Sequence, residues 1–250
     1  MTGILTFGRF EVARLLRSWK FLVITIGFPV LFYMLFLGNR PAGEMIGHTV
    51  AWRTYLMVSM CSFGALVAAL TAGGARLSSE RSSGWARQLR VTPIPAWSYV
   101  TTKVVASMLV VLPVVVLVDL VGLGFGGVHL SPAHWVALTG LIWSTTLPFA
   151  VLGVLIGFLV PAETAFPIVT GLLFVLGYFG GLFNPVASMP RALQVAAHVL
   201  PNFHQTALAF GLLDGHGLGA VNLLVLAGYA AMLSLTVLWK HRLEEARGLA

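Results

Sequence analysis

Long apolar runs with almost no charged residues constrain this chain more than any other feature of its sequence. A helix that crosses the hydrocarbon core of a bilayer needs about 20 mostly apolar residues. Only helices and closed barrels satisfy all their backbone polar groups in lipid, so each run is expected to be a helix. We therefore expect an all-α membrane protein with six transmembrane helices, at residues 21–37, 54–75, 104–125, 135–160, 166–183 and 218–239.

The composition agrees with a chain that is mostly embedded in lipid. Hydrophobic residues make up 58% of the 250 residues, and charged residues make up 9%, whereas a soluble domain has about a quarter of its residues charged. Little chain remains outside the six runs, so residues 1–250 are expected to form one transmembrane domain. A five-span arrangement with partly re-entrant fourth and fifth runs is the alternative, because only residues 161–164 separate those runs.

The placement of Lys and Arg predicts the orientation. Cytoplasmic loops carry an excess of these residues, and six spans put 12 of the 15 on one side. Both termini are therefore expected in the cytoplasm, in a multi-pass protein of the plasma or inner membrane, and the charge of +7 indicates contact with lipid headgroups and not with nucleic acid. The three on the other side are Arg40, Arg53 and Arg191.

Two segments outside the spans have helical character of their own. Residues 1–20 are amphipathic, with Val12, Leu15 and Trp19 on one face, which is typical of a helix in the headgroup plane. Such a helix is either a simple anchor or a lever that joins a cytoplasmic partner to the first span. Residues 184–217 are apolar but interrupted by prolines, which favours short external helices, at 190–199 and 203–213, that re-enter the outer leaflet.

The segment 76–95 is the most informative one between spans. Ser82 or Ser83 is suited to cap a short helix, and Trp85 and Leu89 lie one turn apart on one side of it. Prolines at 93 and 95 end the helix. An aromatic knob with a basic flank indicates a docking element, while a loop bound to anionic lipid is the alternative. The residues expected to take part in docking are Glu80, Arg81, Gly84, Trp85, Arg87, Leu89 and Arg90.

The same segment resembles a known family. Its pattern consists of Arg76, Leu77, Glu80, Arg81, Gly84, Leu89, Val91, Thr92 and Pro93. This pattern is similar to the first cytoplasmic loop of type-2 ABC exporter permeases, a class that includes daunorubicin-exporter-like multidrug permeases. The resemblance implies a permease that pairs with a second copy or a paralogue and with two separate ABC ATPase subunits. It also implies a coupling helix within residues 80–92 that sits in a groove of the ATPase.

The sequence contains no phosphate-binding motif for ATP hydrolysis. A phosphate-binding loop needs Gly-x-x-x-x-Gly-Lys-Ser/Thr, and none of the three lysines follows a glycine. We therefore expect no catalytic residues and no bound cofactor, with ATP and Mg on the partner ATPase. Cys61 is the only cysteine, and His198, His204 and His216 lack tight spacing, so we expect no metal site either.

A path for a hydrophobic or amphipathic substrate is expected between two permease subunits. Asp119 is the one acid deep in an apolar run, and an acid there marks a functional site by default. Its position near the outer interface also fits a hydrogen-bonded structural role, and both remain open. A secondary transporter and a membrane-embedded enzyme are the alternative functions. The candidate path residues are Phe28, Phe32, Tyr55, Met60, Asp119, Phe174 and Tyr178.

Overall fold

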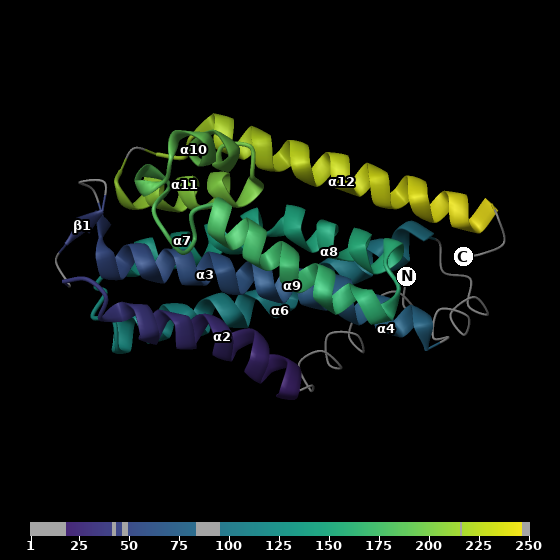
Figure 1. Cartoon of the computed structure of the whole chain (residues 1–250), viewed down its shortest axis with the longest axis horizontal. Coiled ribbons are helices and arrows are strands. Elements are labelled where there is room, and N and C mark those ends of the chain that lie inside the picture. Colours follow the sequence, from purple (N-terminus) through teal and green to yellow (C-terminus); the bar gives the residue numbers. More distant parts are fainter. Residues whose placement is uncertain (1–18, 42–43, 47–49, 84–95, 216, 247–250) are drawn as a thin grey trace.

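Helices that run back and forth along one axis dominate the computed structural model, which describes residues 19–41, 44–46, 50–83, 96–215 and 217–246 (Figure 1). The first part comprises α2 (Trp19–Leu37), the strands β1 (Met45–Ile46) and β2 (Val50–Ala51), α3 (Trp52–Leu70), the π-helical segment η1 (Thr71–Ala75) and α4 (Arg76–Ser82). The middle comprises α6 (Ala96–Gly124), α7 (Pro132–Thr145), α8 (Leu147–Leu159) and α9 (Ala162–Phe179). The last part comprises η2 (Val186–Ser188), α10 (Arg191–Ala197), α11 (Pro201–Leu213) and α12 (Ala220–Ala246).

Each apolar run identified in the sequence is largely helical, although the run at 135–160 is divided into α7 and α8 and α9 ends at Phe179. Five stretches of the described chain are long and apolar enough to cross a membrane, which confirms a mostly helical, multi-pass architecture. The first run contains a shorter apolar helix, Thr25–Leu37, so the count of six spans stays a prediction. The small antiparallel hairpin is a departure from an all-helical chain; it pairs Met45 with Ala51 and Ile46 with Val50.

The centre of the molecule is α3 together with η1 and α4. The most apolar window of this stretch is 94% buried within the chain, whereas that of α9 is 22% buried and that of α12 is 11% buried. Helices α2, α6, α8 and α11 all contact α3. The outer helices therefore present apolar faces that, in a membrane protein, lipid or another membrane chain covers.

Segments expected on one side of the membrane gather at one end of the molecule. The helix α4, the start of α6, the turn between α8 and α9 and the end of α12 lie together, and we name this the loop end (Figure 1). The hairpin β1–β2, α10 and α11 lie at the opposite end. This alternation matches the expected grouping of segment 76–95 with residues 161–164, while the side that faces the cytoplasm stays a prediction.

The two predicted external helices exist with slightly different bounds. In place of 190–199 and 203–213, α10 spans Arg191–Ala197 and α11 spans Pro201–Leu213. Pro201 is the first residue of α11, where a missing N–H costs nothing. Their depth in the bilayer stays a prediction, as does the interfacial helix at 1–20, of which all but residues 19 and 20 lies outside the described residues.

Candidate functional site

The predicted docking loop leaves the loop end from α4 and returns to it at α6. Residues 84–95 lie outside the described residues, and so do five of the predicted docking positions. Those five are Gly84, Trp85, Arg87, Leu89 and Arg90. The structure does place Glu80 and Arg81, the two predicted positions that stand in the stem from which the loop departs.

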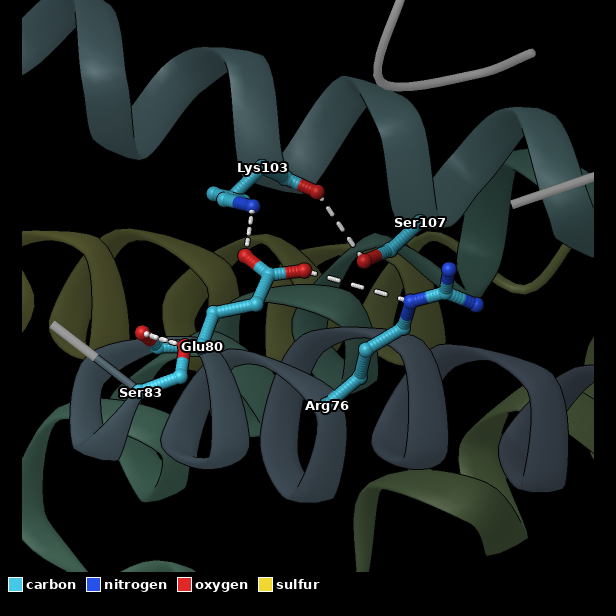
Figure 2. A network of polar contacts seen from close by, with 5 residues as sticks. All are labelled: Arg76, Glu80, Ser83, Lys103 and Ser107. Carbon is cyan, nitrogen blue, oxygen red and sulfur yellow. Dashed lines mark hydrogen bonds and ion pairs between the residues drawn. The ribbon is translucent and has the colours of Figure 1, made fainter. Parts of the chain in front are cut away.

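A buried ion pair joins the two stems of this loop (Figure 2). The Lys103 ammonium on α6 donates to the Glu80 carboxylate on α4, and their side chains are 4% and 10% exposed. The Arg76 Nε atom lies 3.9 Å from the other Glu80 carboxylate oxygen. Hydroxyl groups extend the network, since Ser107 donates to the Lys103 carbonyl at 2.9 Å and Ser83 donates to the Glu80 carbonyl at 2.9 Å.

The pairing changes how the predicted role of Glu80 is understood. The sequence placed its carboxylate among the groups that contact a partner protein, but this carboxylate is directed inward to α6. A charge that leaves water must be paired to persist, and here Lys103 supplies the pairing. In the sequence, Lys103 contributed to the prediction of membrane orientation. Its pairing with Glu80 was missed, because Glu80 lies 23 residues earlier in the chain.

Arg81 ties the same stem to a third helix. Its guanidinium donates to the carbonyl oxygens of Gly157, at 3.1 Å, and of Phe158. These carbonyls belong to the last turn of α8, where a helix has no internal donors left, and a basic side chain is favourable at that position. Ser78 adds a hydrogen bond to the carbonyl of Val160. The loop stem therefore caps α8 immediately before the turn to α9.

Backbone contact between η1 and α8 fixes the position of the stem further into the molecule. A Cβ atom built on Gly153 would lie 2.8 Å from the Ala69 carbonyl oxygen, and one built on Gly157 would lie 2.7 Å from the Gly73 carbonyl oxygen. The two helices touch through their backbones because these residues have no side chain. The Gly-x-x-x-Gly spacing at 153–157 is a recognised signal for such packing, and the sequence analysis missed it.

Asp119 is held by hydrogen bonds from two other helices. Its side chain accepts from the Thr139 hydroxyl on α7 at 2.6 Å and from the Cys61 thiol on α3 at 3.1 Å. The residue is 5% exposed. This geometry favours the hydrogen-bonded structural role, and contact of Asp119 with a substrate stays untested.

The other path candidates separate into two groups. Phe32, Phe174 and Tyr178 line an apolar groove of about 520 Å³ between α2 and α9, and the half-exposed Phe28 packs edge-on against Phe32 with 5.0 Å between ring centroids. Tyr55 and Met60 are instead buried on α3, where the Tyr55 hydroxyl donates to the Gly181 carbonyl at 2.8 Å. The sequence did not separate these groups, and contact of either with a substrate stays a prediction.

Comparisons with known proteins agree with this architecture. The family model described as "ABC-2 type transporter" matches residues 2–211. A protein of Bacillus subtilis (strain 168) that bears the name "Putative transport permease YvfS" is 30% identical over 237 residues, which cover 94% of this chain and 96% of that protein. The similarity therefore extends over the spans, the docking loop and the segment that contains α10 and α11.

Proposed function

Because the chain belongs to the ABC-2 type transporter family, we propose that it is the transmembrane subunit of an ATP-driven exporter. Its loop at residues 76–95 receives a separate ABC ATPase, and the work of ATP hydrolysis moves a hydrophobic or amphipathic substrate out of the cytoplasm or the inner leaflet. The family membership supports the transport role, and the buried stem of the loop supports the role in coupling.

The proposed assembly contains two ATPase subunits and two permease subunits, the second permease being an identical chain or a paralogue. Six spans place both termini and the loop end in the cytoplasm of a cell whose plasma or inner membrane holds the protein. This chain binds no cofactor of its own, and ATP with Mg is bound by the ATPase. The Lys and Arg bias of 12 to 3 supports this orientation.

The observation that carries the proposal is the rigid attachment of the loop at its base. The buried pair between Glu80 and Lys103 holds the two stems together, and the hydrogen bonds from Arg81 attach one stem to α8. A loop that only rests on lipid headgroups needs no such attachment. A loop that transmits a conformational change from a partner does need such an attachment, because movement of the loop would otherwise be absorbed by a flexible stem.

The groove between α2 and α9 supports a substrate route at the surface of this chain. Its lining is aromatic and aliphatic, from Phe32 and Phe36 on α2 to Phe174 and Tyr178 on α9. Placed against a second permease, this groove forms one wall of a lateral cavity. Such a lining suits substrates with a large apolar part, since apolar surface removed from water contributes about 25 cal/mol per Å².

The decisive experiment removes the aromatic knob of the loop. Aromatic interface anchors commonly contribute about 2 kcal/mol or more, which corresponds to a roughly 30-fold loss of affinity. Trp85→Ala is therefore expected to weaken co-purification of the partner ABC ATPase, or to separate ATP turnover from transport. Trp239→Ala is the matched control, because Trp239 lies near the C-terminal end of α12, at the loop end of the molecule, and 64% of its surface is exposed.

The lipid-binding alternative predicts a different order of effects. If the loop binds only anionic lipid, ATPase recruitment is indifferent to Trp85→Ala, while loss of Arg87 and Arg90 together weakens binding to anionic vesicles. Unchanged recruitment with unchanged coupled transport in Trp85→Ala would therefore overturn the assignment of a coupling helix.

A further inference from the structure

Helix α8 is in contact with both ends of the molecule. At its C-terminal end, Arg81 and Ser78 from the loop stem hold its last carbonyls. Its middle touches the backbone of η1 through Gly153 and Gly157. At its N-terminal end, the junction with α7 is bonded to Gln205 of α11, and α11 lies at the opposite end of the molecule from the loop stem (Figure 1).

The junction between α7 and α8 explains the contact with α11. The sequence shows one apolar run there, but α7 ends at Thr145 and α8 begins at Leu147. Pro148 has no N–H to offer the Ser144 carbonyl. The Thr146 N–H bonds to the Trp143 carbonyl at 3.2 Å, so the Ile142 carbonyl needs other donors. The Thr146 hydroxyl donates to the Ile142 carbonyl at 2.6 Å.

Gln205 of α11 supplies a further donor at this break, in addition to the Thr146 hydroxyl and the Thr145 hydroxyl, which lies 3.3 Å from the Ile142 carbonyl. Its side-chain amide donates to the Ile142 carbonyl at 3.1 Å and to the Thr146 hydroxyl at 2.9 Å. Gln205 is 1% exposed. A neighbouring helix that satisfies backbone groups freed by proline is a recognised device in membrane proteins, and here the neighbour belongs to the segment predicted to lie outside.

The glycine contact makes α8 follow the stem. The Cα atom of Gly73 lies 3.4 Å from the position that a Cβ on Gly153 would take, and the Ala69 carbonyl oxygen lies 2.8 Å from it. At this separation no side chain is interposed that a rotamer change might use to absorb a displacement. Movement of η1 and α4 therefore displaces α8 as a body.

We propose that α8 transmits movement of the loop stem to α11, and that Gln205 is the positioning residue that joins the α7–α8 junction to this helix. The proposal rests on the proposed function, because it takes the ATPase as the source of the movement. The proposed path runs from Arg81, at the C-terminal end of α8, to Gln205, which contacts Ile142 of α7 and Thr146 at the N-terminal cap of α8. Loss of the Gln205 amide is expected to leave the ATPase bound and to stop its effect on α11.

The test reads the environment of α11 directly and needs no knowledge of the substrate. Cys61 is replaced by Ser, Asp214 at the end of α11 is replaced by Cys, and the thiol carries a bimane fluorophore. The full complex with its ATPase is reconstituted in liposomes. The measured quantity is the change in bimane emission between the nucleotide-free state and the state trapped with ATP and vanadate.

Gln205→Met is expected to reduce this emission change at least about fivefold, within the range by which mutations along such routes alter coupling. ATPase co-purification is expected to stay within about twofold of the parent, because the ATPase-facing loop is untouched. Gln194→Met is the matched control, since among the described residues the Gln194 amide donates to nearby carbonyls, those of Ala187 and Met189. An undiminished emission change in Gln205→Met overturns the proposal.

Two further outcomes keep the conclusions separate. If the unmodified chain recruits no ATPase, the proposed function itself fails. If Gln205→Met does not assemble, Thr146 provides the second test: Thr146→Val removes the hydroxyl that Gln205 contacts, whereas Thr146→Ser keeps it. The proposal requires a reduced emission change in Thr146→Val and a normal one in Thr146→Ser, and equal, undiminished changes in both overturn it.

Discussion

Breaking the Glu80–Lys103 pair is expected to destabilise the loop end strongly. Removing one partner of a buried ion pair commonly costs about 3–5 kcal/mol, because the other charge stays buried without compensation. With side chains 4% and 10% exposed, this pair belongs to that class. Lys103→Met and Glu80→Gln are each expected to cost about 3 kcal/mol of unfolding free energy or more.

The geometry also predicts an order between the two variants. After Lys103→Met, the Glu80 carboxylate retains Arg76, whose Nε atom lies 3.9 Å away, so the cost falls at the lower end of that range. After Glu80→Gln, both the Lys103 ammonium and the Arg76 guanidinium lose their contact with the Glu80 carboxylate, so the cost is higher. The double variant Glu80→Gln/Lys103→Met is expected to cost less than the two single variants combined, by about 2–3 kcal/mol.

Cys61 provides the assay, because it is the only cysteine in the chain and is fully buried. Its reaction with a thiol reagent during a titration with SDS reports the unfolded fraction of the purified chain. Glu44→Gln is the control, since the Arg40–Glu44 pair has side chains 40% and 37% exposed and such pairs contribute about 1 kcal/mol or less. If Lys103→Met and Glu80→Gln destabilise no more than Glu44→Gln, the interpretation of a buried pair that fixes the stem is refuted.

Three other changes have expected outcomes. Asp119→Asn should keep most transport and assembly, because a neutral amide oxygen still accepts hydrogen bonds; normal assembly with abolished transport would instead assign Asp119 to substrate or proton handling. Gly153→Ala should destabilise the chain in the same thiol assay, by roughly 1–3 kcal/mol as for other overpacked sites, because its new Cβ would lie 2.8 Å from a backbone oxygen, whereas Gly140→Ala adds a methyl group into open space. Single cysteines introduced at Ser188 or Ala250, in a chain that lacks its natural cysteine, should react with an impermeant reagent on intact cells only at Ser188, and reaction at Ala250 would contradict six spans.

The helical segments of this protein were predictable because their cause is local. Each apolar run is long enough to exclude water from its own backbone, so it forms a helix whatever its neighbours are. The stem at residues 76–81 was recognisable for a similar reason, since these residues carry a pattern shared with a known family. The two short helices that follow Pro190 and begin at Pro201 were predictable because proline has no N–H and interrupts a helix.

The contacts within the site were not predictable in the same way. Glu80 meets a lysine 23 residues away, and Arg81 meets carbonyls 76 and 77 residues away. Nothing in the local sequence pairs these groups. The break at Thr146 was not predictable either, because the apolar run continues through it. The presence of Pro148 alone does not tell whether a helix is kinked at this point or ends there.

The sequence by itself determined which segments form long apolar helices, and it predicted how they alternate across the bilayer and where the docking loop lies. Only the tertiary structure decided which face of each span is covered by protein, and therefore that Tyr55 and Met60 are buried while Phe174 and Tyr178 line a groove. The physical reason is that lipid tails and a protein interior are both apolar. A helix in water shows its buried face by contrast with a polar one, whereas a helix in a membrane is apolar on all sides and shows that face only when its neighbours are in place.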